Sequence, residues 1–324
     1  MSIITNPHPG AGDFGQLAEP YRRELVAYGY RMLGSVHDAE EIVQDVYLEA
    51  WRAYDRFEGR SSLRTWLYRI ATRAFVKAAV RQKRRPLPSD IGGPASTAAE
   101  SIQRAPEVFW LQPAQDSLLS GERGQDPAAV VVARQTMRLA FVAVLQVLPP
   151  RQRAVLILRD VLQWHASEVA GLLDISVPAV NSTLQRAHAR LPADHDTLVE
   201  PSEPRQRELI DRYVAAFENA DVETLVAVLT EDAMFEMPPF RTWFRGGAVI
   251  GAFLGARMAE LGPLSVVRTS ANGQPAVALH VAARGGGRRL HALHVLAVEH
   301  SGISRVVAFQ DPAALLHFGL ATHS

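Results

Sequence analysis

The sequence predicts a multi-domain chain in which two all-α bodies are followed by an α+β body, and three observations support this. The chain has 324 residues, enough for two or three domains of about 100–200 residues each. Apolar residues recur at helical spacing through residues 14–85 and 128–191, whereas short β-like runs follow residue 229. Residues 86–127, between the helical stretches, are rich in proline and glycine, as linkers are.

Composition excludes several classes of protein. The chain has no cysteine, which rules out a disulfide scaffold, a thiolate zinc site and a cysteine nucleophile. Residues 1–15 do not resemble a signal peptide, and no run of about 18 apolar residues is long enough to span a membrane. We therefore expect a cytoplasmic protein, and the sequence indicates no metal site, no cofactor and no catalytic constellation.

The charges are segregated along the chain, although 34 basic residues balance 34 acidic residues. Residues 37–58 contain seven acids and two arginines, whereas residues 60–85 contain nine bases and no acid. Adjacent blocks of opposite sign indicate two different partners, one of them a polyanion.

The basic block carries a regular pattern. Five of its members recur at every fourth position and so lie along one helical stripe: Arg69, Arg73, Lys77, Arg81 and Arg85. Like charges at this spacing repel one another, and a phosphate backbone relieves the repulsion. A solvated helix face is the alternative, but such a face normally mixes charges of both signs.

A second pattern indicates a helix-turn-helix in residues 164–191. Two short apolar faces, one around Val169 and Leu172 and one around Val180 and Ala187, flank a turn at residues 174–176. Ser176 suits the cap of the second helix, and Pro178 suits its first turn. Four further residues of that helix would be exposed to a DNA groove: Asn181, Ser182, Gln185 and Arg186. An ordinary pair of packed helices is the alternative interpretation.

These patterns together resemble a known family. Residues 38–51 (DAEEIVQDVYLEAW) resemble the core-polymerase-binding helix of sigma-70 family factors, and residues 57–71 (FEGRSSLRTWLYRIA) resemble their −10 promoter-reading segment. Residues 148–155 (LPPRQRAV), followed by the helix-turn-helix, resemble sigma domain 4, which reads the −35 element. The small size, with only a linker between the two domains, is typical of extracytoplasmic-function sigma factors.

The resemblance implies core RNA polymerase and promoter DNA as partners, and it implies three sets of binding residues. The polymerase-binding set is Asp38, Glu41, Gln44, Asp45, Glu49 and Trp51, with Ile42 and Val46 also packing on the polymerase. The −10 set is Arg60, Ser62, Arg64, Trp66, Arg69, Arg73 and Lys77. The −35 set is Ser176, Pro178, Asn181, Ser182, Gln185 and Arg186.

The resemblance also implies the domain boundaries. We expect sigma domain 2, a helical bundle, over residues 14–86, a flexible linker over 87–127, and sigma domain 4 over 128–194. The stretch 86–127 carries six acids and two bases, so by sign alone it suits the positively charged channel that later holds RNA. Asp174 stands where many relatives have glycine, and aspartate tolerates a left-handed backbone better than most residues.

The part after the hinge at residues 192–204 resembles the SnoaL-like fold, a cone of one curved sheet and a few helices around a pocket. The resemblance rests on YVAAF at 213–217, LTEDA at 229–233 and WFRG at 243–246. We expect an α+β domain over residues 204–320, with a helix over 205–229. The expected strands are at 234–237, 265–270, 276–282, 290–299 and 303–309.

Three roles remain open for this tail. It regulates the sigma portion by contact or by binding a small apolar ligand, it catalyses a reaction with an Asp/His pair, or it is structural or dimerising. Candidate pocket residues are Asp232, Glu236, Trp243, His280 and His294. His291 and His294 are three residues apart in an expected strand, so we expect them to face opposite sides.

The sequence thus predicts a non-enzymatic sigma factor that directs promoter-specific initiation and is regulated by its tail. One alternative is an isomerase- or cyclase-type enzyme tethered to DNA by its N-terminal half. A repressor is a second alternative, but a repressor needs no acidic docking helix. The sequence leaves open the promoter, an anti-sigma partner, and whether the tail activates or inhibits.

Overall fold

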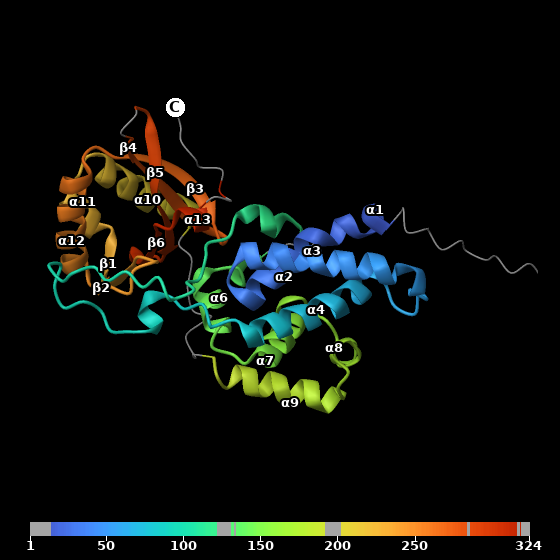
Figure 1. The fold of residues 1–324 in the computed structure, drawn as a ribbon. Helices are drawn as coiled ribbons and strands as arrows, with labels where there is room; N and C mark the ends of the chain where they lie inside the picture. The colour runs from blue at the N-terminus through green and yellow to red at the C-terminus, as the bar shows by residue number, and fades with distance from the viewer. Residues whose placement is uncertain are drawn as a thin grey trace, which may run out of the picture. The chain divides into compact units, whose positions relative to one another are not determined.

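The computed structural model describes residues 14–121, 131–132, 134–191, 202–283, 286–315 and 318, and the chain divides into two compact units (Figure 1). Unit 1 is formed by Met1–Arg84, Ser117–Thr136 and Leu145–Leu191. Unit 2 is formed by Arg85–Asp116, Met137–Val144 and Pro192–Ser324. The predicted fold class, helical regions followed by an α+β domain, is confirmed.

The first part of unit 1 is a helical bundle. Its elements are α1 (Phe14–Ala18), η1 (Glu19–Tyr21), α2 (Arg22–Leu33), α3 (Val36–Ala53), η2 (Tyr54–Arg56) and α4 (Leu63–Arg81). Gly34 ends α2 with a positive φ of 70°, and the Ser35 side chain caps α3 by accepting from the Asp38 N–H at 3.2 Å. The turn expected at Gly34-Ser35 is therefore present.

Aromatic side chains hold this bundle together. The buried Tyr28 of α2 lies edge-on to Phe75 of α4, with ring centroids 5.5 Å apart, and its hydroxyl lies 3.1 Å from Thr72 Oγ1. Gly29 lets α4 approach, because a β-carbon there would lie 2.5 Å from a ring carbon of Phe75. Residue size at the α2–α4 contact therefore sets how closely the helices pack.

The second part of unit 1 contains the predicted helix-turn-helix. Helix α7 (Pro150–Leu156) continues into the π-helical turn η5 (Ile157–Val161), and α8 (Ala166–Leu173) and α9 (Val177–His188) follow. Trp164 joins this part to the bundle, since its ring lies 5.0 Å from that of Tyr68 in α4. A short helix, α6 (Leu139–Leu145), precedes α7 along the chain and, except for its last residue, belongs to unit 2.

Unit 2 is built on one mixed six-stranded sheet in the order β2-β1-β6-β5-β4-β3, in which only β1 and β6 pair in parallel. The strands are β1 (Leu229–Glu236), β2 (Trp243–Arg245), β3 (Ser265–Ala271), β4 (Gln274–Ala282), β5 (Arg288–Val298) and β6 (Ile303–Phe309). The helices are α10 (Glu203–Glu218), α11 (Val222–Ala227), α12 (Gly247–Leu261) and α13 (Pro312–Leu315). All five expected strands are present, and β2 is one that the sequence did not predict.

The core of unit 2 lies between the sheet and α10, α11 and α12 (Figure 1). Phe217, Phe253 and Met258 come from the helices, and Phe235 and Leu279 come from the sheet. The single helix expected over 205–229 is instead two helices, because the chain turns between α10 and α11, where Ala220 has a φ of 53°.

Residues 85–116, named here the interdomain segment, pack on the α+β domain as part of unit 2. The Ala95 N–H donates to the Trp243 carbonyl at 2.8 Å, the Ala105 N–H to the Pro239 carbonyl at 3.1 Å, and the Ala114 N–H to Asn272 Oδ1 at 2.8 Å. The structure thus differs from the expected flexible linker over these residues, because β2, the connection before it and the β3–β4 turn supply hydrogen-bond partners. Residues 122–127 of the expected linker lie outside the described part of the chain.

Residues at the β3–β4 connection also bind residues 137–139, where α6 begins. Asn272 Nδ2 donates to the Met137 carbonyl at 2.8 Å, and the Leu139 N–H donates to Gln274 Oε1 at 3.0 Å. The side chains of Asn272 and Gln274 are both buried. The α+β domain therefore binds the chain at the start of α6 as well as the interdomain segment.

Candidate functional site

Helix α3 has one face in the core and one face in solvent. Val43, Val46 and Ala50 are buried, whereas most of the predicted polymerase-binding residues are exposed: Glu41, Gln44, Asp45, Glu49 and Trp51. Asp38, in the first turn, is half-buried. Val46 cannot dock on a partner as expected, because its side chain belongs to the core of the bundle.

An apolar residue that the sequence analysis did not select completes this face. Leu48 is 52% exposed and Trp51 is 51% exposed, three residues further along the helix. Exposed large apolar side chains set among carboxylates are typical of a protein-binding surface. The signal was present in the sequence as the spacing of Leu48 from Asp45 and Trp51.

Helix α4 carries the predicted basic stripe. Arg73, Lys77 and Arg81 are exposed and Arg69 is half-buried, and α4 contains no acidic residue. The expected stripe ends at Arg81, since α4 ends there. Arg85 is buried in unit 2, where it donates to the Trp110 carbonyl at 3.1 Å and lies over the Phe109 ring.

The residues that begin α4 have local partners. Ser62 Oγ accepts from the Thr65 N–H at 3.1 Å and so caps the helix, and Arg60 forms an exposed pair with Glu58 at 2.5 Å. Arg64 pairs with Glu24 at 2.9 Å. Its guanidinium also lies about 5 Å from the ring centroids of both Tyr68 and Trp164.

Trp66 belongs to a small aromatic cluster. Its ring centroid lies 4.9 Å from that of Phe57 and 6.4 Å from that of Tyr54, and its side chain is half-buried. The residue therefore packs within unit 1 and still presents part of its ring to solvent. That position is compatible with packing in unit 1 and also with stacking on an unpaired base.

The helix-turn-helix has the geometry expected from its sequence. Asp174 ends α8 with a left-handed backbone, φ 56° and ψ 50°, and Ser176 Oγ accepts from the Ala179 N–H at 3.3 Å to cap α9. Val180 and Ala187 are buried, so the opposite face of α9 is presented to solvent. That face carries the predicted residues: Ser176, Pro178, Asn181, Gln185 and Arg186 are exposed, and Ser182 is half-buried.

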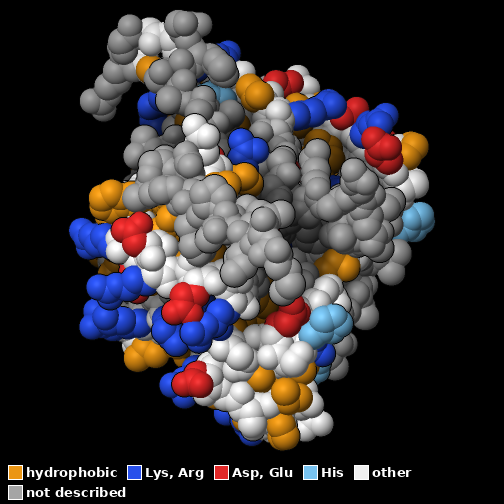
Figure 2. All heavy atoms as spheres, turned by 90° about the vertical axis from the view of Figure 1, so that its right-hand side faces the viewer, with side chains coloured by type: hydrophobic (Ala, Val, Ile, Leu, Met, Phe, Trp, Pro, Cys, Tyr) orange, Lys and Arg blue, Asp and Glu red, His pale blue; other side chains and the backbone are white. Residues whose placement is uncertain are grey.

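Figure 2 shows one face of the molecule, on which Lys and Arg side chains gather along one side with single acidic side chains among them. Clusters of this kind attract a polyanion over distances of about a Debye length, 8–10 Å at moderate salt. The balanced net charge of the chain therefore does not argue against a nucleic-acid partner.

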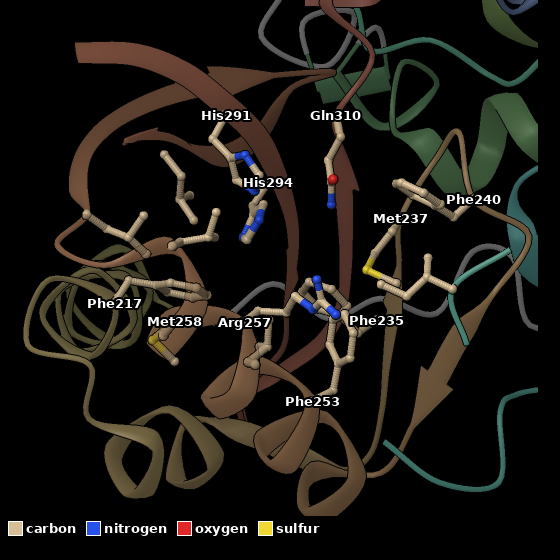
Figure 3. Close-up of a pocket in the computed structure, with 15 residues that line it drawn as sticks. Phe217, Phe235, Met237, Phe240, Phe253, Arg257, Met258, His291, His294 and Gln310 are labelled. Atoms are coloured by element: carbon tan, nitrogen blue, oxygen red, sulfur yellow. The ribbon is translucent and has the colours of Figure 1, made fainter. Parts of the chain in front are cut away.

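Unit 2 contains a cavity of about 130 Å³ between the sheet and α12 (Figure 3). Most of its walls are apolar, with Phe217, Phe235 and Phe253 supplying aromatic rings. Ile102, from the interdomain segment, and Phe240, which follows β1, form part of the wall. The cavity is therefore built by the α+β domain together with the interdomain segment.

Four polar side chains line the cavity: Arg257, His291, His294 and Gln310. His294 Nδ1 lies 2.9 Å from the Tyr213 hydroxyl. Burial, followed by the neighbouring His291, lowers the pKa of His294 to about 3, and burial and Arg289 lower the pKa of His291. Both imidazoles are therefore neutral near pH 7.

The expectation that His291 and His294 face opposite sides is wrong, because β5 contains a bulge. Leu279 pairs with Ala292 whereas the next residue, His280, pairs with Leu290, so His291 is an extra residue on β5. Such an insertion changes the side to which neighbouring side chains point. Both histidines consequently line the same cavity.

Of the five predicted pocket residues, only His294 lines this cavity. Asp232 is exposed and lies 3.8 Å from Arg245, and Trp243 Nε1 donates to the Gly92 carbonyl at 2.9 Å. Glu236 is buried and binds Ser89 and Arg305, and His280 is buried outside the cavity lining. No Asp or Glu is among the described residues that line the cavity, so no Asp/His pair forms there.

Two further observations limit the chemistry of the described residues. They contain no group of three or more His, Asp or Glu side chains arranged to hold a metal ion. Within the same residues, no helix is both long enough and apolar enough to cross a membrane.

Comparisons with known proteins agree with this architecture. Residues 17–85 match the family model for sigma-70 region 2, residues 138–191 match sigma-70 region 4, and residues 210–306 match the SnoaL-like domain. The chain is 45% identical over 316 residues to the ECF RNA polymerase sigma factor SigG of Mycobacterium tuberculosis, covering 95% of this chain and 84% of SigG.

A second relative from the same organism is more distant in sequence. The ECF sigma factor SigJ of Mycobacterium tuberculosis is 28% identical over 217 residues, which cover 67% of this chain and 62% of SigJ. The crystal structure of SigJ, described as an extracytoplasmic function sigma factor, superposes with a TM-score of 0.59 over 95% of this chain and 98% of SigJ, at 21% identity. That likeness shows a common fold.

The two helical regions and their order define the class, a sigma-70 type initiation factor. With its 45% identity to a relative over nearly the whole chain, the protein belongs to the ECF RNA polymerase sigma factors and carries a C-terminal SnoaL-like domain. It directs transcription initiation, and its family is not enzymatic.

Proposed function

We propose that this sigma factor binds core RNA polymerase through the exposed face of α3 and contacts promoter DNA through α4 and α9. The observation that carries the proposal is the separation of two surfaces within one bundle. Carboxylates surround Leu48 and Trp51 on α3, and cations line α4 without an acid among them. A protein partner with basic groups fits the first surface and a phosphate backbone fits the second.

The −10 and −35 contacts follow from the same surfaces. Arg69, Arg73 and Lys77 would position the phosphate backbone at the −10 element, with Trp66 stacking on an unpaired base. Asn181 and Gln185 on α9 would read base edges at the −35 element. A factor that makes these contacts would act in the cytoplasm, where the polymerase and the chromosome are.

We further propose that the SnoaL-like domain regulates initiation through the chain that joins regions 2 and 4. Support comes from its hydrogen bonds to both ends of that connection, at Ala95 and Ala105 on one side and at Met137 and Leu139 on the other. A domain that fixes these residues restricts the separations that the two DNA-reading regions can adopt.

Run-off transcription from a pool of genomic fragments tests both proposals. Core polymerase with the full chain should yield specific transcripts, and a chain ending at residue 200 should yield a different amount from the same promoters. Transcripts unchanged by removal of the domain would contradict its regulatory role. Polymerase that stays inactive and unbound by the full chain would contradict the assignment of α3.

DNA contacts can be separated by their dependence on salt. Holoenzyme carrying Arg73→Ala or Lys77→Ala should show a slope of log affinity against log salt reduced by about one for each cation removed. Asn181→Ala should instead change the preferred −35 sequence and leave the slope unaltered. Arg207→Ala, an exposed cation of unit 2, is the control. An equal loss on all sequences for Asn181→Ala would contradict its assignment to base reading.

A further inference from the structure

The cavity of unit 2 has room for a small apolar body. An engineered cavity of about 150 Å³ with apolar walls binds benzene, so a volume of about 130 Å³ suits a single ring or a short branched chain. The rings of Phe235 and Phe253, 6.1 Å apart, and the side chains of Leu254 and Met258 enclose this space. Burial of the ligand's apolar surface would therefore drive binding.

One part of the cavity wall is polar. In Figure 3 the side chains of His294 and Gln310 point into the cavity, and the guanidinium of Arg257 lies beside Phe253. Burial raises the pKa of Tyr213 well above its usual value, so its hydroxyl keeps its proton. The hydroxyl then donates to His294 Nδ1, which leaves Nε2 of the neutral ring as an N–H donor.

The charge of the lining selects the kind of polar group that a ligand can bring. Arg257 is the cation, both histidines are neutral, and no carboxylate is among the described lining residues. Arg257 pairs with Glu260 at 2.8 Å, but this pair of residues three apart on α12 is exposed and therefore weak. A ligand carboxylate can share Arg257 with Glu260 or replace Glu260 as its partner. The same carboxylate can also accept from His294 and the Gln310 amide.

The wall formed by Ile102 connects this cavity to the interdomain segment. Ile102 lies between two attachments, since the Ala95 N–H donates to Trp243 and the Ala105 N–H donates to Pro239. Beside it, the Gln103 N–H donates to Thr242 Oγ1 at 2.9 Å, and the Gln103 carbonyl accepts from the Arg241 N–H at 2.8 Å. A ligand in the cavity contacts Ile102 directly and adds dispersion contacts to that side chain.

Phe240 makes the same connection from the side of the domain. It lines the cavity and forms a β-bridge with Arg104 of the interdomain segment. A bound ligand therefore touches both partners of the attachment. Ligand binding and attachment of residues 95–105 then favour each other. The attached segment gives the ligand the Ile102 side chain to contact, and the bound ligand gives the segment additional contacts.

We propose that the SnoaL-like domain binds a small apolar carboxylic acid in this cavity, and that the bound acid strengthens the attachment of residues 95–105 to the domain. The proposal rests on the regulatory role proposed above and gives it a ligand class and a point of action. The acid's apolar body occupies the space between α12 and the sheet, and its carboxylate meets Arg257, His294 and Gln310.

The test uses the full chain and two probes with the same ring, phenylacetate and 2-phenylethanol. Isothermal calorimetry should show phenylacetate binding about tenfold more tightly than the alcohol, because only the acid forms charge-assisted hydrogen bonds. Hydrogen exchange of the Ala95, Gln103 and Ala105 amides should slow about threefold or more in saturating phenylacetate. Equal affinities for the two probes, no binding of either, or binding without slower exchange would each overturn the proposal.

Four variants test the parts of the proposal separately. Arg257→Gln should abolish the preference for the acid, and Leu261→Trp, which fills the cavity from α12, should abolish binding of both probes. Ile102→Ala should keep phenylacetate binding within about threefold and lose its effect on exchange. Ile91→Ala, an exposed residue of the same segment, is the matched control and should behave as wild type.

The outcome can be read independently of the proposed function. Calorimetry and exchange need neither polymerase nor DNA, so their result stands whether or not the full chain initiates transcription. Run-off transcription that changes with deletion of the domain but not with phenylacetate, in a protein that binds phenylacetate, would preserve the regulatory domain and overturn the acid as its signal.

Discussion

Glu236 is the residue at which one side chain fixes two distant parts of unit 2. It is fully buried, accepts from the Ser89 N–H at 2.9 Å and pairs with Arg305 at 2.5 Å. Arg305 in turn donates to Ser89 Oγ at 3.0 Å. A carboxylate that the sequence suggested for a pocket thus anchors the start of the interdomain segment to β1 and β6.

Replacing this carboxylate should release the segment. Glu236→Gln removes the charge that compensates Arg305, and the loss of one partner of a buried pair costs about 3 kcal/mol or more. We expect a lower free energy of unfolding in urea and faster hydrogen exchange at the Ser89 amide. Asp232→Asn, an exposed carboxylate of the same strand, should change stability by less than about 0.5 kcal/mol. Equal effects of the two variants would contradict the anchor.

His294 makes the stability of unit 2 depend on pH. Its pKa in the folded protein, about 3, is lower than the value of about 6.5 expected in the unfolded chain. Between these values the unfolded state binds the proton that the folded state excludes, so stability is retained above pH 6.5 and falls as the pH drops below it. The slope can reach about 1.4 kcal/mol per pH unit.

Urea unfolding at pH 7.5, 6.0 and 5.0 measures this dependence. His294→Gln, which can still accept from Tyr213, should flatten the curve in this range, whereas the exposed His300→Gln should leave it as in wild type. A wild-type slope that survives in His294→Gln would assign the dependence to other groups, including His291.

At the scale of elements, close approach decides how α2, α3 and α4 pack. A β-carbon on Gly29 would lie 2.5 Å from Phe75 Cζ and 2.9 Å from Ala39 Cβ, so α3 and α4 would both have to shift. Overpacking of this kind costs about 1–3 kcal/mol, which exceeds the gain of up to about 1 kcal/mol from replacing a helical glycine.

Gly29→Ala should therefore destabilise the protein by about 1–2 kcal/mol in thermal or denaturant unfolding. Gly171→Ala in α8 is the matched control, because no atom lies within 4 Å of the added carbon, and it should stabilise by about 0.5–1 kcal/mol. A stabilised Gly29→Ala protein would show that the bundle relaxes around the new methyl group.

At the scale of the whole molecule, contacts within unit 1 join sigma-70 regions 2 and 4. Trp164 is 5% exposed and packs on Tyr68 and Arg64 of α4, near the start of the helix-turn-helix. In this arrangement Arg64 is paired within the protein, so its use on DNA requires it to leave Glu24 or share it. The contact therefore couples the relative position of regions 2 and 4 to one of the predicted −10 residues.

Removing the indole should loosen that contact. Trp164→Ala should lower the free energy of unfolding by about 3–5 kcal/mol, as loss of a buried aromatic does, and should speed hydrogen exchange in α8. Trp51→Ala, 51% exposed on α3, should leave stability within about 0.5 kcal/mol and weaken binding to core polymerase instead. The reverse pattern would exchange the roles assigned to the two tryptophans.

Much of the molecule could be predicted from the sequence, since local patterns determine the elements that carry them. Several features depend on residues that are close together in the sequence: the cap at Ser176, the left-handed backbone of Asp174, the acidic and basic helices and the five expected strands. The family motifs occupy the same local stretches. The three family matches confirm the predicted class, and the individual contact residues remain predictions.

What the sequence alone could not determine depends on partners far along the chain. A bulge lets His291 line the same cavity as His294, and the Ser89 amide donates to Glu236, 147 positions away. Ile102 completes a cavity whose other walls come from residues 217–310. Proline and glycine predict a flexible linker over residues 87–127, but only the folded domain supplies the hydrogen-bond partners that hold residues 85–116. Short-range sterics thus fixed the elements of this protein, whereas long-range packing and hydrogen bonding decided the cavity and the attachment of the segment that joins its two DNA-reading regions.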